Sequence, residues 1–375
     1  MGLIITPQVE IDKYFASPAI NQSTLKELQG GLDSLMISIA KRNKQEEENG
    51  PTPDYFLIGG AVDCILTGEE GVFEDKYYVS QLDKKPTEVE MKIVDYVFVL
   101  AEAEGSLNLN FEDCEEWILE AANAMEWQMR WKAETRVAKL IEAGVAYFED
   151  KKRAFGKEII SADMYDNIQN IVTSLKTNFR TAKYFNREEQ AEIENIDFYY
   201  QLPMYFTYRG IECKALMDLV IVFKDSSGNI VKIQPIDLKT MNGNTLQFIS
   251  KIRMHRYDIQ ASWYSYALCE YFDIPVTNRD EILQPFQFIV ESTTNIGTPL
   301  VFELTHSSLY HGANGSPAGT FKASDSDRTL FYPAQKGWKQ LITEYVHYQK
   351  QGFHTDIQIE DSVEPIRIDY LKGIL

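Results

Sequence analysis

Three runs of strand-forming residues follow one another between positions 199 and 240, separated only by short turns. They cover 199–208, 211–223 and 230–240, and each is rich in aromatic and branched apolar residues. The first turn contains Arg209-Gly210 and the second Asp225-Ser226-Ser227-Gly228-Asn229, and turns of this composition are typical of β-hairpins. The sequence therefore predicts an antiparallel meander at the centre of the fold.

Helical patterns flank this meander on both sides. Asn21 and Ser23 are both candidates for an N-cap, and the leucines at 25, 28, 32 and 35 then recur with helical spacing. We expect further helices over 56–66, 257–272 and 334–351, strands over 285–291 and 300–304, a loop over 41–53, and a second loop over 305–320. Helices beside a sheet of this kind indicate an α/β or α+β core with helical layers.

A long helical region interrupts the chain before the meander. Residues 87–183 are amphipathic and carry both charge signs, and we expect Trp117, Trp127 and Trp131 to face its core. No self-similar period is visible, which favours an insertion over a repeat array. We therefore divide the chain into an N-terminal helical part over 1–80 that contributes one helix to the core, a helical insertion over 81–190, and the core over 191–375.

Composition limits the classes of function. The formal net charge of −19 argues against a general polyanion binder, so any nucleic-acid function needs a local basic patch and bound cations. No run of eighteen apolar residues predicts a transmembrane helix, and the first residues lack the features of a signal peptide. The four cysteines form no C-x-x-C pair, which disfavours a zinc ribbon or an iron–sulfur cluster. We expect free thiols in a cytoplasmic protein.

Two acidic positions and one lysine stand out within the meander. Asp218 closes an apolar run, and Asp237 and Lys239 lie nineteen and twenty-one residues later on the next strand. Because side chains alternate along a strand, Asp237 and Lys239 share one face while Leu238 points into the core. Charges on a buried strand are costly unless they bind something, and a divalent metal with a phosphodiester would offset that cost.

The same residues suit phosphodiester hydrolysis. Hard divalent cations prefer oxygen ligands, which Asp218, Asp237 and the backbone carbonyl of Leu238 can supply. Lys239 reaches the same face and could orient or deprotonate the attacking water, and a lysine beside metal ions is expected to have a lowered pKa. Taken singly, however, these residues are better explained by a strand end at Asp218 and an exposed ion pair between Asp237 and Lys239.

This arrangement resembles the signature of the PD-(D/E)XK nuclease superfamily. Asp218 and Asp237-Leu238-Lys239 occur in the order of that signature, and Gln260 and Tyr264 on the next helix resemble the Q-x-x-x-Y motif of the RecB-like branch. The helix over 56–66 resembles the one that carries G-x-x-x-H in this branch, and Asp63 stands at the position of its histidine.

Further similarity and one further difference lie elsewhere in the chain. Residues 18–25 resemble the start of RecE-type proteins, which are similar to exodeoxyribonuclease VIII of phages and bacteria. Gln201 stands where relatives often carry glutamate. The resemblance implies a central mixed sheet flanked by helices, Mg²⁺ or Mn²⁺ as cofactor, and DNA as substrate. It also implies Asp218, Asp237 and Asp63 as metal ligands, with Gln260 and Tyr264 positioning the substrate or Lys239.

A cationic stretch precedes the helix that carries Gln260. It consists of Lys251, Arg253, His255 and Arg256, and we expect it to contact DNA phosphates close to the site. A solvated turn before a helix is the alternative interpretation of these four residues.

We hypothesise from the sequence that the protein is a metal-dependent DNA nuclease, and more specifically an exonuclease of phage or bacterial recombination, repair or replication. The partners expected under this hypothesis are DNA and a single-strand annealing protein or another recombination or replication protein. A homo-oligomer is compatible with the hypothesis, and no association with a membrane is expected. The alternative is a non-catalytic nuclease-fold module that binds DNA or a protein, since Asp63 and Gln201 depart from the pattern. A third hypothesis is an interaction protein in which the helical insertion carries the function.

Overall fold

A six-stranded mixed sheet forms the centre of the computed structural model, which describes residues 4–5, 8–38, 40, 52–80, 82, 86–106, 108–322 and 329–353. Its strands, in spatial order, are β1 (Ile4–Ile5), β4 (Ile196–Tyr208), β5 (Ile211–Lys224), β6 (Ile230–Met241), β7 (Phe286–Ser292) and β8 (Leu300–Leu304). The pairs β4–β5, β5–β6 and β7–β8 are antiparallel, whereas β1–β4 and β6–β7 are parallel. The predicted meander is therefore confirmed as β4–β5–β6.

The turn between β5 and β6 shows why the second hairpin forms where the sequence predicts it. Asp225 accepts hydrogen bonds from the backbone N–H groups of Ser227 and Asn229 at 2.8 and 2.9 Å. Gly228 has a φ of 85°, which glycine adopts without the steric cost that a side chain brings. The residues of the turn itself thus specify this connection, without help from long-range packing.

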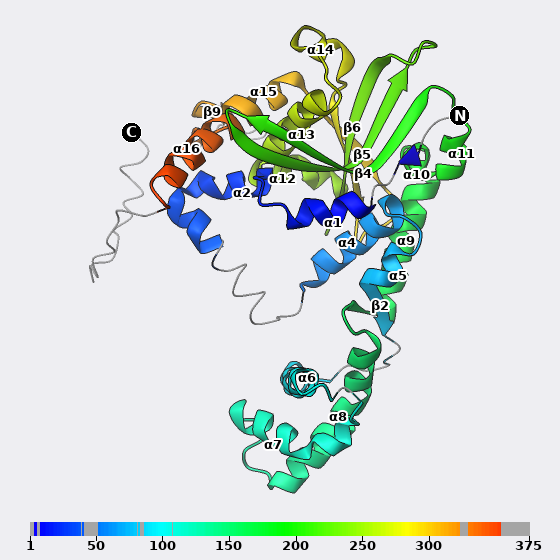
Figure 1. Ribbon diagram of the computed structural model, residues 1–375, viewed down its shortest axis with the longest axis vertical. Coiled ribbons are helices and arrows are strands. Elements are labelled where there is room, and N and C mark those ends of the chain that lie inside the picture. Colours follow the sequence, from blue (N-terminus) through cyan, green and yellow to red (C-terminus); the bar gives the residue numbers. More distant parts are fainter. Residues whose placement is uncertain are drawn as a thin grey trace.

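Helices cover both faces of the sheet (Figure 1). On one face, α2 (Gln22–Glu27), α13 (Tyr257–Tyr271) and α16 (Trp338–Lys350) pack around the fully buried Trp263. On the other face, α4 (Asp54–Thr67) and α9 (Ala162–Thr177) form a second apolar cluster. The architecture is a mixed α/β fold with a central sheet between helical layers.

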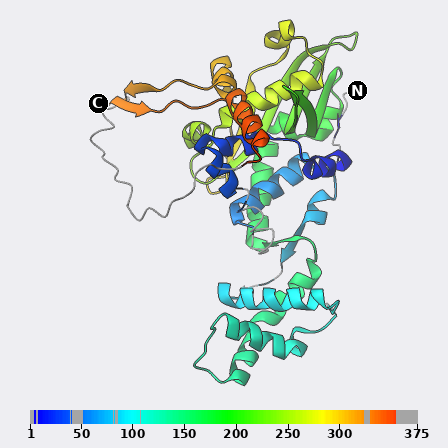
Figure 2. The same cartoon turned by 60° about the vertical axis from the view of Figure 1, so that its left-hand side comes forward.

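A separate helical lobe extends away from the sheet, as Figures 1 and 2 show. It contains α6 (Glu88–Ala103), α7 (Glu115–Ala124) and α8 (Ala133–Arg153) around a third apolar cluster that includes Phe111 and Phe148. A parallel strand pair, β2 (Tyr77–Ser80) with β3 (Glu158–Ser161), lies where the chain enters and leaves the lobe. From α9 onward, the region assigned to the insertion packs on the sheet instead.

Two of the three tryptophans expected to face the core of this region do so. Trp117 and Trp127 pack against the lobe core, but the prediction for Trp131 is wrong because its side chain is 43% exposed. The four cysteines are free, as expected, and the structure also shows that all four are buried. Among the described helices, none has both the length and the apolar character needed to cross a membrane.

The predicted loop over 305–320 is also wrong, since α15 (His306–Asn314) occupies most of it. Thr305 caps this helix by accepting a hydrogen bond from the backbone N–H of Ser308. At Gly312 the helix approaches α13 so closely that a Cβ atom would lie 2.0 Å from the carbonyl oxygen of Asp258. Tertiary packing against α13, rather than local sequence preference, therefore explains this helix.

The remaining elements are short and mostly link those above. They are α1 (Gln8–Ala16), η1 (Leu28–Gly30), α5 (Val72–Lys76), η2 (Phe111–Cys114), α10 (Ala182–Phe185), α11 (Arg187–Ala191), η3 (Thr245–Gln247), α12 (Phe248–Met254), η4 (Val276–Asn278), α14 (Arg279–Ile282), β9 (Gly319–Lys322) and β10 (Thr329–Tyr332). Residues 32–38 are helical as well, and most of the loop expected over 41–53 lies outside the described residues.

Candidate functional site

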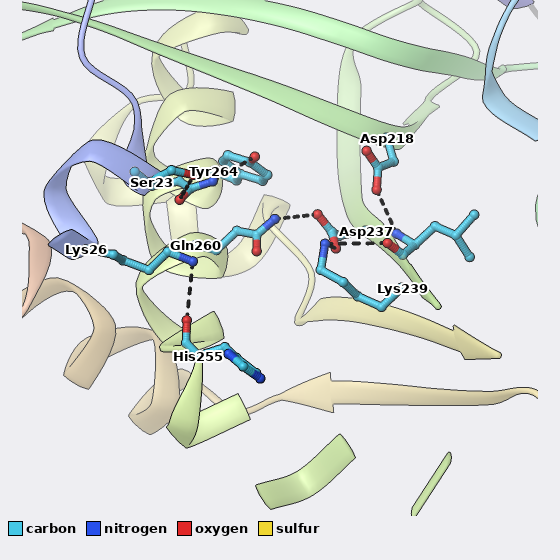
Figure 3. A network of polar contacts seen from close by, with 10 residues as sticks. Ser23, Lys26, Asp218, Asp237, Lys239, His255, Gln260 and Tyr264 are labelled. Carbon is cyan, nitrogen blue, oxygen red and sulfur yellow. Dashed lines mark hydrogen bonds and ion pairs between the residues drawn. The ribbon is translucent and has the colours of Figure 1, made fainter. Parts of the chain in front are cut away.

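The candidate site begins where β5 and β6 run side by side. Asp218 lies on β5, and its Oδ2 accepts a hydrogen bond from the backbone N–H of Leu238 on β6 at 2.8 Å. The Leu238 side chain packs into the cluster formed with α4 and α9, so Asp237 and Lys239 project from the opposite face, as the alternation predicts. The Lys239 ammonium forms an ion pair with Oδ2 of Asp237 (Figure 3).

Helix α13 adds two polar side chains to this pair of strands. The amide Nε2 of Gln260 donates to Oδ1 of Asp237 at 2.6 Å, which ties the helix directly to the acidic strand. Tyr264, one turn later, has its hydroxyl 3.3 Å from Nε2 of Gln22, from which it accepts a hydrogen bond. The two motif residues thus differ in their contacts, since Gln260 holds Asp237 and Tyr264 holds α2.

Helix α4 brings a third carboxylate, Asp63, towards the strands. Its close approach depends on Gly59, where a Cβ atom would lie 3.3 Å from Oγ1 of Thr240 near the end of β6. A side chain at this position would require Thr240 or the helix to move by a few tenths of an ångström. The packing therefore keeps Asp63 within electrostatic reach of Asp218, Asp237 and Lys239.

The strands β4 and β5 reverse their faces beside the site. Tyr200 and Leu219 pack in the cluster with α4, whereas Leu202 and Met217 pack in the cluster with α13. Yet Leu202 is only two positions from Tyr200, and Met217 only two positions from Leu219. Regular alternation would keep residues two apart on one face.

Gln201 is the residue at which this reversal occurs. Its φ of 48° lies in the left-handed region, and the ladder omits the pair that it would form with Asp218. Its Nε2 donates to Oγ1 of Thr67 at 2.7 Å, and the same hydroxyl donates to the carbonyl oxygen of Asp63 at 2.6 Å. A backbone conformation that costs energy is thus located at the site, and it links β4 to the helix of Asp63.

The electrostatics of the site are unbalanced towards negative charge. Burial, with the neighbouring Asp218 carboxylate, raises the pKa of Asp63 well above its usual range. Burial and the Asp237 carboxylate raise the pKa of Asp218 to about 7, and burial likewise raises the pKa of Asp237. Burial would lower the pKa of Lys239, but Asp237 and Asp218 outweigh it and hold that pKa above its ordinary value. The sequence analysis predicted a lowered pKa for Lys239, because it assumed that metal ions are bound beside it.

The donor set fits a hard divalent cation. The site offers only hard oxygen ligands, namely the carboxylates of Asp63, Asp218 and Asp237 and the carbonyl oxygen of Leu238. A cation would balance the negative charge of the carboxylates that Lys239 alone does not neutralise. Within the described part of the chain, no three His, Cys, Asp or Glu side chains are close enough to form a complete cage. Mg²⁺ does not require one, since it is usually held by one or two carboxylates together with water and phosphate oxygens.

The cationic stretch before α13 divides into two parts. Arg253 and His255 are exposed and Lys251 is half-buried. Burial and then the charge of Lys251 lower the pKa of His255. Arg256 is different, because it is only 6% exposed and its guanidinium donates twice to Asp258, each time at 3.0 Å.

Arg256 is therefore engaged in contacts within the protein, and its predicted contact with DNA stays a prediction. Its third donor bonds to the carbonyl oxygen of Lys336 at 2.9 Å, so the guanidinium joins the start of α13 to the chain before α16. Its φ of 52° places it at the helix N-cap in the left-handed region. A phosphate could reach this group only after a bidentate ion pair had broken.

Two residues on α2 and one at the start of α13 belong to the site but were not predicted from the sequence. Gln22 contacts Tyr264, and Lys26 lies beside Tyr257 and Lys239. A signal was present, because Gln22 and Lys26 are four residues apart and so share one face of the helix predicted after Asn21. Nothing in the sequence, however, indicated that this face would contact α13.

Comparisons with known proteins say little about the function of this site. No protein-family model matches the chain, and no curated protein matches it. A crystal structure of a "Putative exonuclease" from Eubacterium rectale is similar over 52% of this chain and 68% of that chain, with 19% sequence identity and a TM-score of 0.28. The function proposed below therefore stands on the site itself.

Proposed function

We propose that this protein is a metal-dependent deoxyribonuclease with a PD-(D/E)XK-type site. The observation that carries the proposal is the juxtaposition of Asp218, Asp237 and Lys239 on adjacent strands, with Gln260 of the following helix bonded to Asp237. A structural ion pair would need neither the extra carboxylate nor the amide. Burying this excess of negative charge is costly, and binding a cation and a phosphate offsets that cost.

Asp218 and Asp237 would hold Mg²⁺ or Mn²⁺, with Asp63 and the Leu238 carbonyl as further oxygen ligands. The ion would neutralise the phosphoryl oxygens and lower the pKa of a bound water. Lys239 would face the same phosphate, where its ammonium can orient the attacking water and stabilise developing negative charge. Gln260 would keep the Asp237 carboxylate in one orientation through its 2.6 Å hydrogen bond.

The more specific form of the proposal is an exonuclease of phage or bacterial DNA recombination, repair or replication. It is supported by the resemblance of residues 18–25 to the start of RecE-type proteins. The side chains of α2 also reach the site, because Gln22 bonds to Tyr264. A single-strand annealing protein is the partner that this form of the proposal implies.

A cleavage assay tests the proposal. Purified protein is incubated with linear and circular DNA, each single- and double-stranded, in Mg²⁺, Mn²⁺ or EDTA. We expect cutting with either metal and none in EDTA, and an exonuclease will degrade linear DNA only. Asp237→Asn should abolish cutting, because it removes one charge from the metal ligands while keeping the shape of the side chain.

Asp197→Asn is the matched control, since Asp197 is also a buried aspartate paired with a lysine in the same sheet. We expect this variant to cut at the wild-type rate per folded molecule. Cutting that survives in Asp237→Asn would refute the proposed site. A wild-type protein that binds DNA but cuts none in any metal would favour the non-catalytic module instead.

A further inference from the structure

Lys26 is a second lysine beside the candidate site, on α2 rather than on the sheet. Its ammonium donates to the carbonyl oxygen of His255 at 3.3 Å and lies 5.7 Å from the centre of the Tyr257 ring. The ammonium of Lys239 lies 5.6 Å from the same ring. Two lysines from distant parts of the chain thus lie near the same aromatic ring at the edge of the site.

The two lysines differ in their counter-charges. Lys239 has the carboxylate of Asp237 as its ion-pair partner. Among the residues that the structure describes, no carboxylate forms an ion pair with Lys26, whose ammonium has a backbone carbonyl as its hydrogen-bond acceptor. A half-buried ammonium without an ionic partner is unfavourable unless an anion binds to it.

Electrostatics agree with this geometry. Burial, followed by repulsion from Lys239, lowers the pKa of Lys26 to about 8, although Asp237, Asp258 and Glu27 oppose the shift. Lys26 in turn contributes to lowering the pKa of His255. The surroundings of Lys26 therefore favour loss of its positive charge, and a bound phosphate would reverse this.

The position of Lys26 is fixed by contacts made elsewhere on α2. Gln22, one turn earlier on the same face, bonds to Tyr264 of α13 at 3.3 Å. Leu25 and Leu28 anchor this segment in the core, where both are fully buried. The backbone that carries Lys26 is therefore held in place. This keeps the ammonium of Lys26 close to the site.

We propose that Lys26 binds a backbone phosphate of the nucleic-acid strand that occupies this site, next to the phosphate that Lys239 faces. The proposal rests on the proposed function and deepens it, since it names a substrate contact outside the sheet. With Lys251 nearby, Lys26 gives a chain of net charge −19 a local cationic surface where a polyanion would approach the site.

A purely structural role is the competing explanation, in which Lys26 only ties α2 to the turn before α13. Lys26→Gln separates the two roles, because glutamine keeps a hydrogen-bond donor for the His255 carbonyl but carries no charge. Lys26→Arg keeps the charge. Lys157→Met is a matched control, since the Lys157 ammonium also donates to a backbone carbonyl, that of Glu74 at 2.6 Å, but lies outside the site.

The experiment measures binding without cleavage. The full chain and its variants are titrated into a fluorescein-labelled single-stranded 20-mer in EDTA, and anisotropy is followed from about 50 to 200 mM salt. We expect Lys26→Gln and Lys26→Met to bind roughly tenfold more weakly, the effect of losing one charge-assisted contact. The slope of log affinity against log salt should fall by about 0.7 in both. Lys26→Arg and Lys157→Met should match the wild type.

The outcomes separate this inference from the proposed function. If Lys26→Gln binds as the wild type does, with the same salt slope, the inference is overturned and Lys26 is structural. A wild-type protein that does not bind the oligonucleotide also overturns it. If the wild type binds and Lys26→Gln binds more weakly, but no metal supports cutting, the nuclease proposal fails while the phosphate contact stands. Melting curves of each variant show that the protein compared is folded.

Discussion

The sheet contains two lysine–aspartate pairs that look alike and sit in different surroundings. Lys224 pairs with Asp197 across β4 and β5, and Lys239 pairs with Asp237 along β6. The side chains of Lys224 and Asp197 are 32% and 7% exposed, and those of Lys239 and Asp237 are 23% and 2% exposed. Residue type and burial alone therefore do not distinguish a structural pair from a candidate catalytic one.

The surroundings make the difference. Lys224 ends its strand beside a turn, and its backbone N–H bonds to the carbonyl of Asn195. Around Lys239 and Asp237, by contrast, Asp218 and Asp63 add further carboxylates. The pKa of Asp63 is raised by burial and by Asp218, and the pKa of Asp218 by burial and by Asp237. A lysine–aspartate pair on a strand indicates a functional site when further carboxylates lie beside it and the lysine cannot neutralise all of them.

The largest expected difference between the two pairs concerns cleavage. Lys239→Met should lower the rate of DNA cutting by roughly 10²–10³-fold, because a cation facing the phosphate is lost from a partly buried site. Lys224→Met removes a lysine from the same sheet and should leave the rate per folded molecule unchanged. The measurement is the initial rate on a linear duplex in Mg²⁺, corrected for the folded fraction. Equal losses in both variants would mean that the two pairs do not differ in function.

A smaller effect concerns stability and its dependence on metal. Asp218→Asn should raise the free energy of unfolding in EDTA by about 0.5–2 kcal/mol, since it removes one of three clustered carboxylates and keeps an acceptor for the Leu238 N–H. Mg²⁺ at ten times its dissociation constant should stabilise the wild type by about 1.4 kcal/mol and the variant by less. Urea unfolding with and without Mg²⁺ measures both.

Asp197→Asn provides the comparison for that experiment. Its partner Lys224 would lose an ion pair, so this variant should be less stable than the wild type and should respond to Mg²⁺ as the wild type does. Destabilisation of Asp218→Asn to the same extent would show that Asp218 is an ordinary structural aspartate.

The smallest effect is expected for an exposed pair in the helical lobe. Lys92 and Glu88 on α6 form an ion pair at 2.8 Å, but their side chains are 58% and 78% exposed. Water and salt screen such a pair, so Lys92→Ala should give no resolvable change in melting temperature and none in cleavage. A clear loss of cleavage in this variant would indicate that the lobe takes part in the reaction, as the third sequence-based hypothesis holds.

Local sequence was sufficient to predict the meander and the direction of two site residues. Turn chemistry around Gly210 and Asp225 fixed the hairpins, and period-two alternation placed Asp237 and Lys239 opposite Leu238. Helical spacing likewise placed Gln260 and Tyr264 on one face of α13. These features depend on residues that are close in sequence, which is why pattern alone was enough.

The remaining features depend on packing between distant segments. The face reversal at Gln201 occurs against the alternation of β4, and there the side chain of Gln201 contacts Thr67 and Asp218, which lie on other segments. The helix over His306–Asn314 forms because Gly312 lets it approach α13. Lys26 reaches the site because α2 docks on α13, a contact that no spacing in the sequence encodes.

The hydrogen bond between Gln22 and Tyr264 joins residues 242 positions apart, and this has a consequence for biosynthesis. At translation rates of about 5–20 residues per second, α13 is completed roughly 10–50 seconds after α2 leaves the ribosome. During that interval the apolar side of α2, with Leu25 and Leu28, lacks the partners that bury it in the finished fold. The nascent chain therefore completes the apolar cluster around Trp263 and assembles its charged site only after α13 has been made, and a chain that ended before α13 would have neither.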